Sequence, residues 1–271
     1  MKAVYLEGPK KIFVKDVEEP KPLPGKAIIK IKMCGICGSD TAAYMGTSPV
    51  VKYPVIIGHE AIGEIVQIDE DNPAGLRVGD RVVCEPVTFC GKCYPCRVGR
   101  RNNCSNIKTC GVHRPGMMSE LFQHDVELLH KVPDTITDEQ ACMIEPLTIG
   151  LHATHRVNVQ KGEVCVITGA GTIGLVCALS AMAYGAVPIV LDPVDERLEI
   201  AREMGIEYVC NNVKSDAISY IKEVNGGELP PVLYECSGAT PVVSKFHEYV
   251  SGCGRVVFVG WPHENMEVDM S

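Results

Sequence analysis

The sequence predicts an α/β plus β fold in two parts. The first half is expected to form an irregular antiparallel barrel or sandwich, because short apolar segments, often alternating, are punctuated there by Gly, Pro and Asp. The second half is expected to form a doubly wound parallel sheet, because strand-like and helix-like segments alternate and a glycine-rich turn follows the first strand. We place the boundary at about residue 150, which gives domains 1–150 and 151–271.

Six segments of the first half have the composition of strands. They cover residues 3–6, 12–17, 26–33, 61–68, 80–85 and 121–131. Turn-forming residues separate them. Thr137 and Gln140 then form a capping-box pair, which predicts a helix from there to about His155.

The second half predicts five strands with four helices between them. The strands cover 164–168, 187–191, 208–210, 232–235 and 255–259, and the helices cover 172–184, 195–204, 215–224 and 241–250. Thr240 and Pro241 suit the N-cap and first turn of the last helix. This alternation is typical of a parallel sheet with helices packed on it.

The charge balance argues against a nucleic-acid surface. The chain carries 34 acidic and 26 basic side chains, a net charge of −8, whereas nucleic-acid binding needs a concentrated basic field. The basic run at 97–101 is therefore expected to be a solvated face. No apolar run reaches the length of a membrane span, and the N-terminus lacks the apolar core of a signal peptide.

Fourteen cysteines indicate a reducing environment and predict a cytoplasmic protein. Several of them lie in apolar surroundings and are interpreted as buried thiols that behave as small hydrophobic residues. These are Cys34, Cys84, Cys142, Cys165, Cys177, Cys236 and Cys253.

Four other cysteines have the spacing of a structural zinc site, C-x2-C-x2-C-x7-C. They are Cys90, Cys93, Cys96 and Cys104. Three sulfurs can converge from one loop and a hairpin can bring in the fourth, which makes the closed tetrahedral site that zinc prefers. A disulfide-rich loop in a secreted protein is the alternative, and the intracellular character of the rest of the chain disfavours it.

A G-x-G-x-x-G turn follows the apolar strand at 164–168 and opens an apolar helix. Its residues are Gly169, Gly171, Thr172, Ile173 and Gly174, with Ala170 between the first two. The first glycine permits the tight turn, the second lets the backbone approach a pyrophosphate, and the third lets helix and strand pack closely. In this strand–turn–helix context the motif predicts a dinucleotide site.

Asp192 indicates which dinucleotide is bound. It ends the next strand, eighteen residues after Gly174, where a carboxylate accepts hydrogen bonds from a ribose diol and repels a 2′-phosphate. We therefore predict NAD rather than NADP. Arg197 could pair with a 2′-phosphate, but with Asp192 present we expect it to stack on the adenine. The alternative for Asp192 is a turn or N-cap carboxylate before the helix at 195–204.

Three further segments have the residue types of a catalytic metal centre. Cys37 lies in CGICGSD, His59 and Glu60 in IIGHE, and Glu145 in IEPL. A thiolate, an imidazole and one or two carboxylates suit zinc with an open coordination position. Each residue alone also fits a plain role as a core thiol, a loop histidine or a helix charge.

His59 and Glu60 are adjacent, and neighbouring side chains of an extended chain point in opposite directions. We therefore predict His59 as the ligand and place Glu60 beside the metal or as an exchangeable ligand.

Together these motifs resemble the zinc-dependent medium-chain dehydrogenases, a family that includes alcohol, sorbitol and threonine dehydrogenases. The resemblance covers essentially the whole chain and is strongest to the polyol branch, because Glu145 stands where alcohol dehydrogenases proper carry a cysteine. It implies a GroES-like barrel for the first half and a Rossmann domain for the second. It also implies two zinc ions per chain, with the catalytic one on Cys37, His59 and Glu145 and with Glu60 close by.

The implied reaction is the reversible oxidation of a secondary alcohol to a ketone, with hydride transfer to the nicotinamide of NAD. The substrate is expected to be a small alcohol such as a polyol, sugar acid or amino alcohol. Ser39 would pass the substrate proton toward the cofactor ribose. Many relatives carry a histidine shortly after the Ser–Asp pair, whereas this chain has none at 41–44, so we assign no relay beyond Ser39.

The cofactor sheet of the family has six strands, whereas only five are predicted before Ser271, and the returning segment that completes the barrel is not found. The alternative hypothesis is therefore a truncated, catalytically incompetent protein that keeps zinc binding, with or without nucleotide binding. A homo-oligomer is expected if the family C-terminus is present. A zinc-free quinone-type reductase is disfavoured by the intact set Cys37, His59 and Glu145.

Residues expected at the substrate pocket are Tyr44, His113, Arg114 and Met117, of which Arg114 would suit a carboxylate or phosphate.

Overall fold

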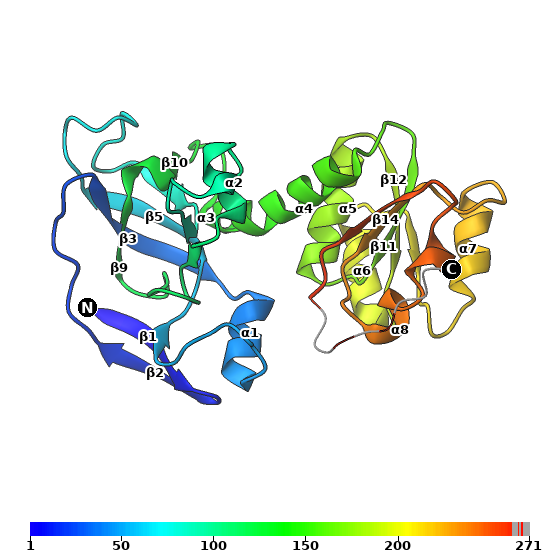
Figure 1. Ribbon diagram of the computed structural model, residues 1–271, viewed down its shortest axis with the longest axis horizontal. Helices are drawn as coiled ribbons and strands as arrows, with labels where there is room; N and C mark the ends of the chain where they lie inside the picture. The colour runs from blue at the N-terminus through cyan, green and yellow to red at the C-terminus, as the bar shows by residue number, and fades with distance from the viewer. Residues whose placement is uncertain (262–264, 266, 268–271) are drawn as a thin grey trace. The chain divides into compact units, whose positions relative to one another are not determined.

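The structure is a computed structural model that describes residues 1–261, 265 and 267 (Figure 1). The chain divides into two compact units, Met1–Glu145 and Pro146–Ser271. The division falls at the start of helix α4 (Ile144–Val157). An antiparallel β unit is followed by a parallel α/β unit, which confirms the predicted fold class.

Antiparallel sheets build the first unit. The larger sheet has the order β10 (Leu129–Lys131), β6 (Arg81–Cys84), β5 (Glu60–Gln67), β3 (Lys26–Gly35) and β9 (Leu121–Asp125). A smaller sheet has the order β2 (Lys11–Asp16), β1 (Lys2–Gly8) and β4 (Val55–Ile56), and β7 (Val87–Thr88) pairs with β8 (Lys108–Thr109). Ile29, Ile65, Val82 and Phe122 belong to the apolar core of the larger sheet.

The strand predicted at 121–131 is interrupted. A 3₁₀ turn at Val126–Leu128 separates β9 from β10, and these two strands lie at opposite edges of the larger sheet. The turn changes the direction of the chain, so that β9 pairs with β3 whereas β10 pairs with β6.

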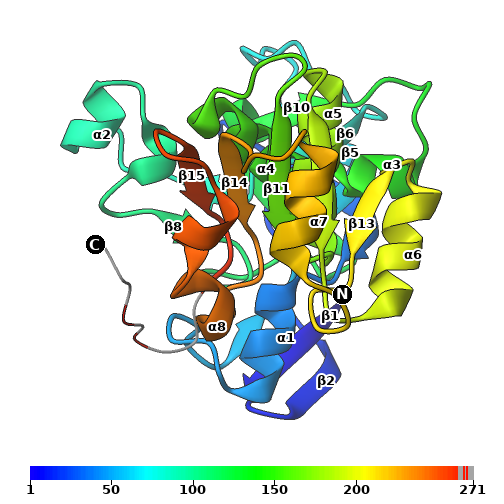
Figure 2. The same ribbon diagram turned by 90° about the vertical axis from the view of Figure 1, so that its right-hand side faces the viewer.

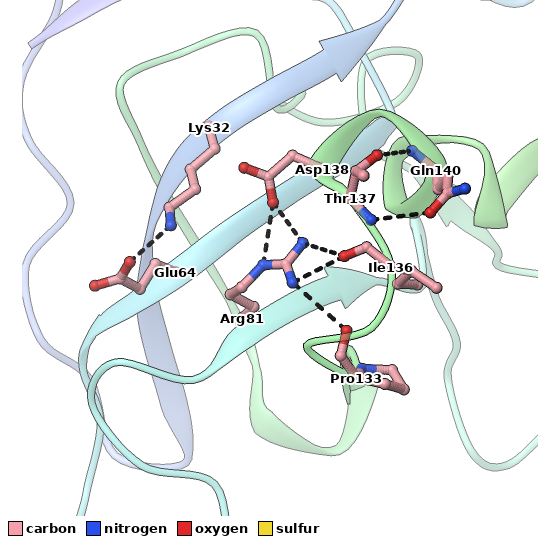
Figure 3. A network of polar contacts seen from close by, with 8 residues as sticks. All are labelled: Lys32, Glu64, Arg81, Pro133, Ile136, Thr137, Asp138 and Gln140. Atoms are coloured by element: carbon pink, nitrogen blue, oxygen red, sulfur yellow. Dashed lines mark hydrogen bonds and ion pairs between the residues drawn. The ribbon is translucent and has the colours of Figure 1, made fainter.

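A polar network fixes the start of helix α3 (Asp138–Cys142) (Figure 3). The guanidinium of Arg81, on β6, donates to Asp138 Oδ1 over 2.6 Å. Gln140 N donates to Thr137 Oγ1 over 3.2 Å and Thr137 N donates to Gln140 Oε1 over 3.0 Å, which is the predicted capping box. Helix α4 then begins as a separate element, so the single helix predicted here is two.

One parallel sheet forms the centre of the second unit. Its order is β13 (Tyr208–Cys210), β12 (Val187–Leu191), β11 (Val164–Thr168), β14 (Val232–Glu235) and β15 (Arg255–Phe258). Besides α4, the helices of this unit are α5 (Thr172–Ala183), α6 (Asp195–Glu203), α7 (Ala217–Val224) and α8 (Thr240–Val243). Figure 2 shows α6 and α7 beside β13. The strand order reverses between β11 and β14, and ligands of doubly wound sheets bind at such a point.

Two details of the second unit differ from the prediction. The helix expected at 241–250 is a short α8 followed by a 3₁₀ turn at Phe246–Tyr249, and its N-cap is Ala239, one residue before the predicted Thr240. Cys253, expected to be buried, is exposed at a positive φ of 62° in the turn before β15. In this turn the Cys253 side chain lies outside the core.

All fourteen cysteines of the chain are free thiols. Over the described part of the chain, no helix combines the length and apolarity that a membrane span requires.

Candidate metal and dinucleotide sites

Cys37 lies where the chain leaves β3 and enters α1 (Gly38–Met45), a helix that the strand-based prediction missed. It is the N-cap of that helix, with extended backbone angles. Its backbone N–H donates to Asp40 Oδ2 over 3.0 Å. Asp40, at the third position of the helix, therefore holds the turn that presents the Cys37 sulfur.

His59 follows a glycine that no other residue could replace easily. Gly58 has a φ of 94°, and a Cβ there would lie 2.8 Å from Cys34 Sγ and 2.6 Å from Met118 Cγ. The N–H of Gly58 donates to Asp40 Oδ1 over 3.2 Å. The same carboxylate thus ties the His59 segment to the Cys37 segment.

The ligand atoms of Cys37, His59 and Glu60 lie within 4.8 Å of one another. The expectation that His59 and Glu60 point apart does not hold here, because β5 begins at Glu60 and His59 lies outside the regular strand. The Glu60 carboxylate lies over Gly35, at a position that a Cβ on that glycine would occupy. Three side chains from two segments that are distant in sequence therefore supply donors to one point.

The charges around His59 favour its protonated form. Burial opposes that form, but the Cys37 side chain and the charges of Asp40 and Glu145 raise the pKa of His59 to about 9. Nδ1 of His59 lies 3.9 Å from Asp40 Oδ1 and, among the described residues, has no hydrogen-bond partner. A bound cation would also interact favourably with this buried imidazole and with the thiol and carboxylate beside it.

Glu145 does not belong to the close group of three. Its side chain is half-buried, and this burial raises the pKa of its carboxyl group. The nearby charge of His59 lowers that pKa, and the charge of Glu60 raises it further. Ser39, in the first turn of α1, places its Oγ 3.5 Å from His59 Nε2. The structure therefore brings Cys37, His59 and Glu60 together, with Ser39 and Glu145 adjacent.

The donor set fits zinc. A thiolate, an imidazole and a carboxylate are the ligand types of catalytic zinc sites, and the three donors leave coordination positions for a further ligand and a substrate. A single buried carboxylate, Asp40, hydrogen-bonds the backbone of both ligand segments, as residues that orient metal ligands do.

The four cysteines of the 90–104 loop converge. Sγ of Cys93 lies 3.4 Å from that of Cys96 and 3.8 Å from that of Cys104, which lies 3.5 Å from that of Cys90. These separations are far beyond the roughly 2.05 Å of a disulfide. They match the sulfur–sulfur edge of about 3.8 Å that follows from tetrahedral geometry and a Zn–S bond of about 2.3 Å.

Backbone amides favour the thiolate form in this loop. Hydrogen bonds from the Lys92 and Cys93 amides lower the pKa of Cys90 to about 6, and the amides of Cys96 and Ser105 lower the pKa of Cys93. Thiolates are the metal-binding form of cysteine. The loop therefore fits a closed tetrahedral zinc site.

The glycine-rich turn has the geometry that a dinucleotide requires. Gly169 has a φ of 93°, and a Cβ on Gly174 would overlap the carbonyl oxygen of Gly169. Gly171 is the N-cap of α5 and has open space where a Cβ would be, and no side chain caps the helix. The free N–H groups at the start of α5 can therefore bind a pyrophosphate.

Asp192 has a structural contact that the sequence did not indicate. It is 2% exposed, and it accepts hydrogen bonds from Ala170 N over 2.8 Å and from Val194 N over 2.9 Å. Arg197, expected to stack on an adenine, has Nη1 3.6 Å from Asp192 Oδ2. Asp192 thus holds the glycine-rich turn and is the turn carboxylate before α6 that the alternative interpretation predicted, but it is not the N-cap of α6, which is Val194.

Glu235 was not singled out from the sequence. It is fully buried at the end of β14, where it accepts hydrogen bonds from Thr168 Oγ1 over 3.2 Å, Ser237 N over 2.9 Å and Gly238 N over 3.0 Å. It thereby joins the ends of β11 and β14 where the strand order reverses. The only sequence signal was an acidic residue at the end of an apolar strand.

The structure places the residues expected at a substrate pocket in different surroundings. Met117 is fully buried in the core of the first unit, and Tyr44 packs beside a second apolar cluster. His113 and Arg114 line a cavity of the first unit.

Comparison with known proteins agrees with both halves of the chain. Residues 23–134 match the family model of the alcohol dehydrogenase GroES-like domain, and residues 172–271 match that of the zinc-binding dehydrogenases. An uncharacterized zinc-type alcohol dehydrogenase-like protein of Haemophilus influenzae is 45% identical over 97% of this chain and 77% of its own length. A sorbitol dehydrogenase of Halalkalibacterium halodurans is 38% identical over 90% of this chain and 72% of its own length.

Solved structures share the fold. RspB of Escherichia coli CFT073, described as a short chain alcohol dehydrogenase and complexed with NADH, has a TM-score of 0.87 and 34% identity over 99% of this chain and 79% of its own. A putative zinc-binding dehydrogenase of Sinorhizobium meliloti, bound to NADP, has a TM-score of 0.90 and 29% identity over 100% of this chain and 79% of its own. With its two motif-bearing units and these relatives, the chain belongs to the zinc-dependent medium-chain dehydrogenases, in the polyol dehydrogenase-like part of that family.

Proposed function

We propose that this protein is a zinc- and NAD-dependent oxidoreductase that oxidises a secondary alcohol of a polyol, sugar acid or related small molecule. The observation that carries the proposal is the convergence of Cys37, His59 and Glu60 within 4.8 Å, with Asp40 hydrogen-bonded to both ligand segments. Family membership supports the reaction class, an oxidation of CH–OH donors.

Cys37 and His59 are the proposed protein ligands of the catalytic zinc, with Glu145 or Glu60 as the third. Bound there, zinc supplies a Lewis acid that makes a hydroxyl more acidic. Glu60 lies in the close group and Glu145 beside it, so either carboxylate can complete the site or hydrogen-bond to it. Asp40 accepts hydrogen bonds from the backbone of both ligand segments, and its charge lies 3.9 Å from His59 Nδ1.

Ser39 is the proposed first acceptor of the substrate proton. Its hydroxyl lies in the first turn of α1, 3.5 Å from His59 Nε2, and its side chain is exposed. A hydroxyl there can accept the proton and pass it to solvent or to the cofactor ribose. The positioning of the substrate and the cofactor against each other lowers the activation barrier further.

The dinucleotide is proposed to bind across Gly169–Gly174, with its pyrophosphate at the start of α5. Asp192 lies at the end of the next strand and makes NAD the preferred form, because its negative charge repels a 2′-phosphate. The four-cysteine loop holds a second, structural zinc.

A homo-oligomer, where the C-terminal segment of the family is present, and a reducing, cytoplasmic compartment are also part of the proposal. All fourteen cysteines are free thiols, as a reducing compartment requires. In the described part of the chain β15 pairs only with β14, and the nearby Phe258 and Trp261 are 51% and 68% exposed. An unpaired strand edge with exposed aromatic residues favours association.

The test combines metal analysis with turnover. Purified protein should contain two zinc ions per chain and reduce NAD in the presence of at least one member of a panel of polyols, aldonates and amino alcohols. The kcat/KM should be higher with NAD than with NADP. Zinc at zero or one per chain, or NADH binding without turnover of any panel member, would contradict the proposal.

A further inference from the structure

The first unit contains a cavity of about 470 Å³ whose charged lining is entirely basic. Lys52, His113 and Arg114 contribute the basic groups, and Tyr5 and Tyr53 contribute aromatic surface. None of the eleven residues that line the cavity is acidic, although the chain as a whole has a net charge of −8. A basic cavity in an acidic protein indicates an anionic ligand.

Arg114 is one of the basic residues that line this cavity. Its side chain is half-buried, and within the described residues its guanidinium makes no hydrogen bond or ion pair. Its backbone is fixed, because Gly111 N donates to Arg114 O over 2.9 Å and Gly116 N donates to Ile56 O over 2.7 Å. The guanidinium, a fork of N–H donors, lines the cavity without a partner among the described residues, which suits a bidentate carboxylate or phosphate.

His113 supplies a second donor from the same turn. Its Nδ1 accepts a hydrogen bond from Thr109 N over 3.1 Å. A proton cannot also occupy that nitrogen, so the neutral ring carries its proton on Nε2 and can donate there. Lys52, from the segment before β4, adds a second positive charge.

The cavity shares a segment of chain with the proposed metal site. Val55 and Ile56 line it, and His59 follows Ile56 by three residues, so the two Cα atoms lie within about 11 Å. The turn that carries Arg114 packs on the same segment, because a Cβ on Gly111 would lie 2.8 Å from Gly58 N. The cavity therefore lies next to the chain segment that carries His59.

We propose that Arg114, with Lys52 and His113, binds a carboxylate or phosphate group at one end of the alcohol substrate. The substrate class is then a sugar acid or sugar phosphate and not a neutral polyol. This inference rests on the proposed oxidoreductase function for its catalytic part, whereas the anion site itself can be measured without turnover.

The experiment compares wild-type protein with Arg114→Gln, Arg114→Lys and the control Arg156→Gln, which removes an exposed charge on α4 that does not line the cavity. Zinc-loaded protein is titrated at low salt with inorganic phosphate, an aldonate, a sugar phosphate and the corresponding neutral polyol. The ratio of kcat/KM for each anionic substrate to that for the neutral polyol is measured in parallel.

Arg114→Gln should weaken binding of phosphate and of the anionic substrates about 10- to 100-fold and lower the kcat/KM ratio by a similar factor. Arg114→Lys should recover part of the loss, because it keeps the charge but not the fork, and Arg156→Gln should behave as wild type. The tighter of the two anionic ligands identifies carboxylate or phosphate.

Anion binding or a kcat/KM ratio that does not change in Arg114→Gln overturns the inference. If no substrate is turned over, the oxidoreductase proposal fails, while Arg114-dependent binding of the anionic ligands over the polyol still supports the site. Loss of fold in Arg114→Gln is recognised by circular dichroism, and Lys52→Gln then replaces it, with the same direction of change expected.

Discussion

Asp40 is the residue on which the proposed catalytic site most depends without being a ligand. Its two oxygens accept hydrogen bonds from Cys37 N and Gly58 N, and it is 4% exposed. In Asp40→Asn one acceptor becomes a donor and the charge near His59 is lost. We expect kcat/KM or affinity for the catalytic zinc to fall about 10- to 100-fold with the fold retained.

The measurement is zinc content per chain together with NAD reduction. Asp134→Asn is the matched control, because Asp134 is exposed and lies outside both metal sites. Wild-type activity in Asp40→Asn would show that Asp40 does not orient the ligands.

His124 makes stability depend on pH. It is fully buried, its Nε2 donates to Glu85 O over 2.7 Å, and burial lowers its pKa to about 4 from an unfolded value of 6.5. Between these values the unfolded chain binds more protons than the folded chain. The neutral, buried imidazole therefore makes its full contribution to the free energy of unfolding above about pH 6.5. This contribution is lost as the pH falls toward 4, and the loss is about 2 kcal/mol at pH 5.

Urea unfolding of wild type, His124→Gln and His152→Gln at pH 7.5 and pH 5 tests this. Glutamine can keep the donated hydrogen bond but does not titrate. From pH 7.5 to pH 5, the free energy of unfolding of His124→Gln should therefore fall by about 2 kcal/mol less than that of wild type. His152 is exposed on α4, and its variant should follow wild type. Equal pH dependence in all three proteins would contradict the prediction.

At the scale of elements, the capping box of α3 has a separable effect on stability. Thr137 accepts from Gln140 N and its backbone donates to the Gln140 side chain. Thr137→Ala should lower the free energy of unfolding by about 1 kcal/mol, since one N-terminal amide of the helix loses its partner. Chemical denaturation measures the change, and Thr135→Ala, an exposed residue two positions earlier, should change it by less than about 0.5 kcal/mol.

The glycine-rich turn separates folding from cofactor binding. A Cβ on Gly174 would overlap Gly169 O, so Gly174→Ala should destabilise the second unit and abolish NADH binding. A Cβ on Gly171 meets no protein atom within 4 Å, so Gly171→Ala should fold normally but bind NADH at least about tenfold more weakly, because the methyl group enters the pyrophosphate position. Thermal unfolding and NADH fluorescence titration distinguish the two; normal NADH affinity in Gly171→Ala would argue against pyrophosphate binding at this turn.

Element prediction succeeded where local pattern and tertiary context agree. The bounds of β11, β12, β13 and β14 match the predicted strands, because continuous apolar runs between turns are typical of strands that are buried on both faces. Helix α1 was missed because its residues, 38–45, show no apolar periodicity, and its start is determined by Asp40 and by the contact with Gly58. The helix at 241–250 is broken into α8 and a 3₁₀ turn at Phe246–Tyr249, and the turn packs against the apolar cluster of the sheet.

At the scale of the whole molecule, the two proposed zinc sites should have different roles. Cys93→Ser removes one ligand of a closed site whose metal stabilises a loop, and we expect zinc content to fall to one per chain and the free energy of unfolding to fall by at least about 2 kcal/mol. Cys37→Ser removes a ligand of the open site, and turnover should be lost while the unfolding temperature stays within a few degrees of wild type.

Metal analysis, thermal unfolding and NAD reduction on the same preparations check this pair. Each variant is the control for the other, because both exchange one half-buried thiol for a hydroxyl. Equal loss of fold in both variants would contradict the separation of structural and catalytic roles.

The sequence by itself determined the fold class, the family and the identity of both ligand-rich segments, because spacings such as C-x2-C and G-x-G-x-x-G are constraints within a single loop. Only the tertiary structure decided that the Glu60 carboxylate, and not that of Glu145, joins Cys37 and His59 in the close group. It alone also showed that Asp40 hydrogen-bonds both ligand segments and that Arg114 lines a cavity with no acidic residue. Those facts depend on how β3, β5 and the turn at 109–116 meet. Contacts between residues far apart in the chain are determined by packing and strand pairing, which no local spacing encodes.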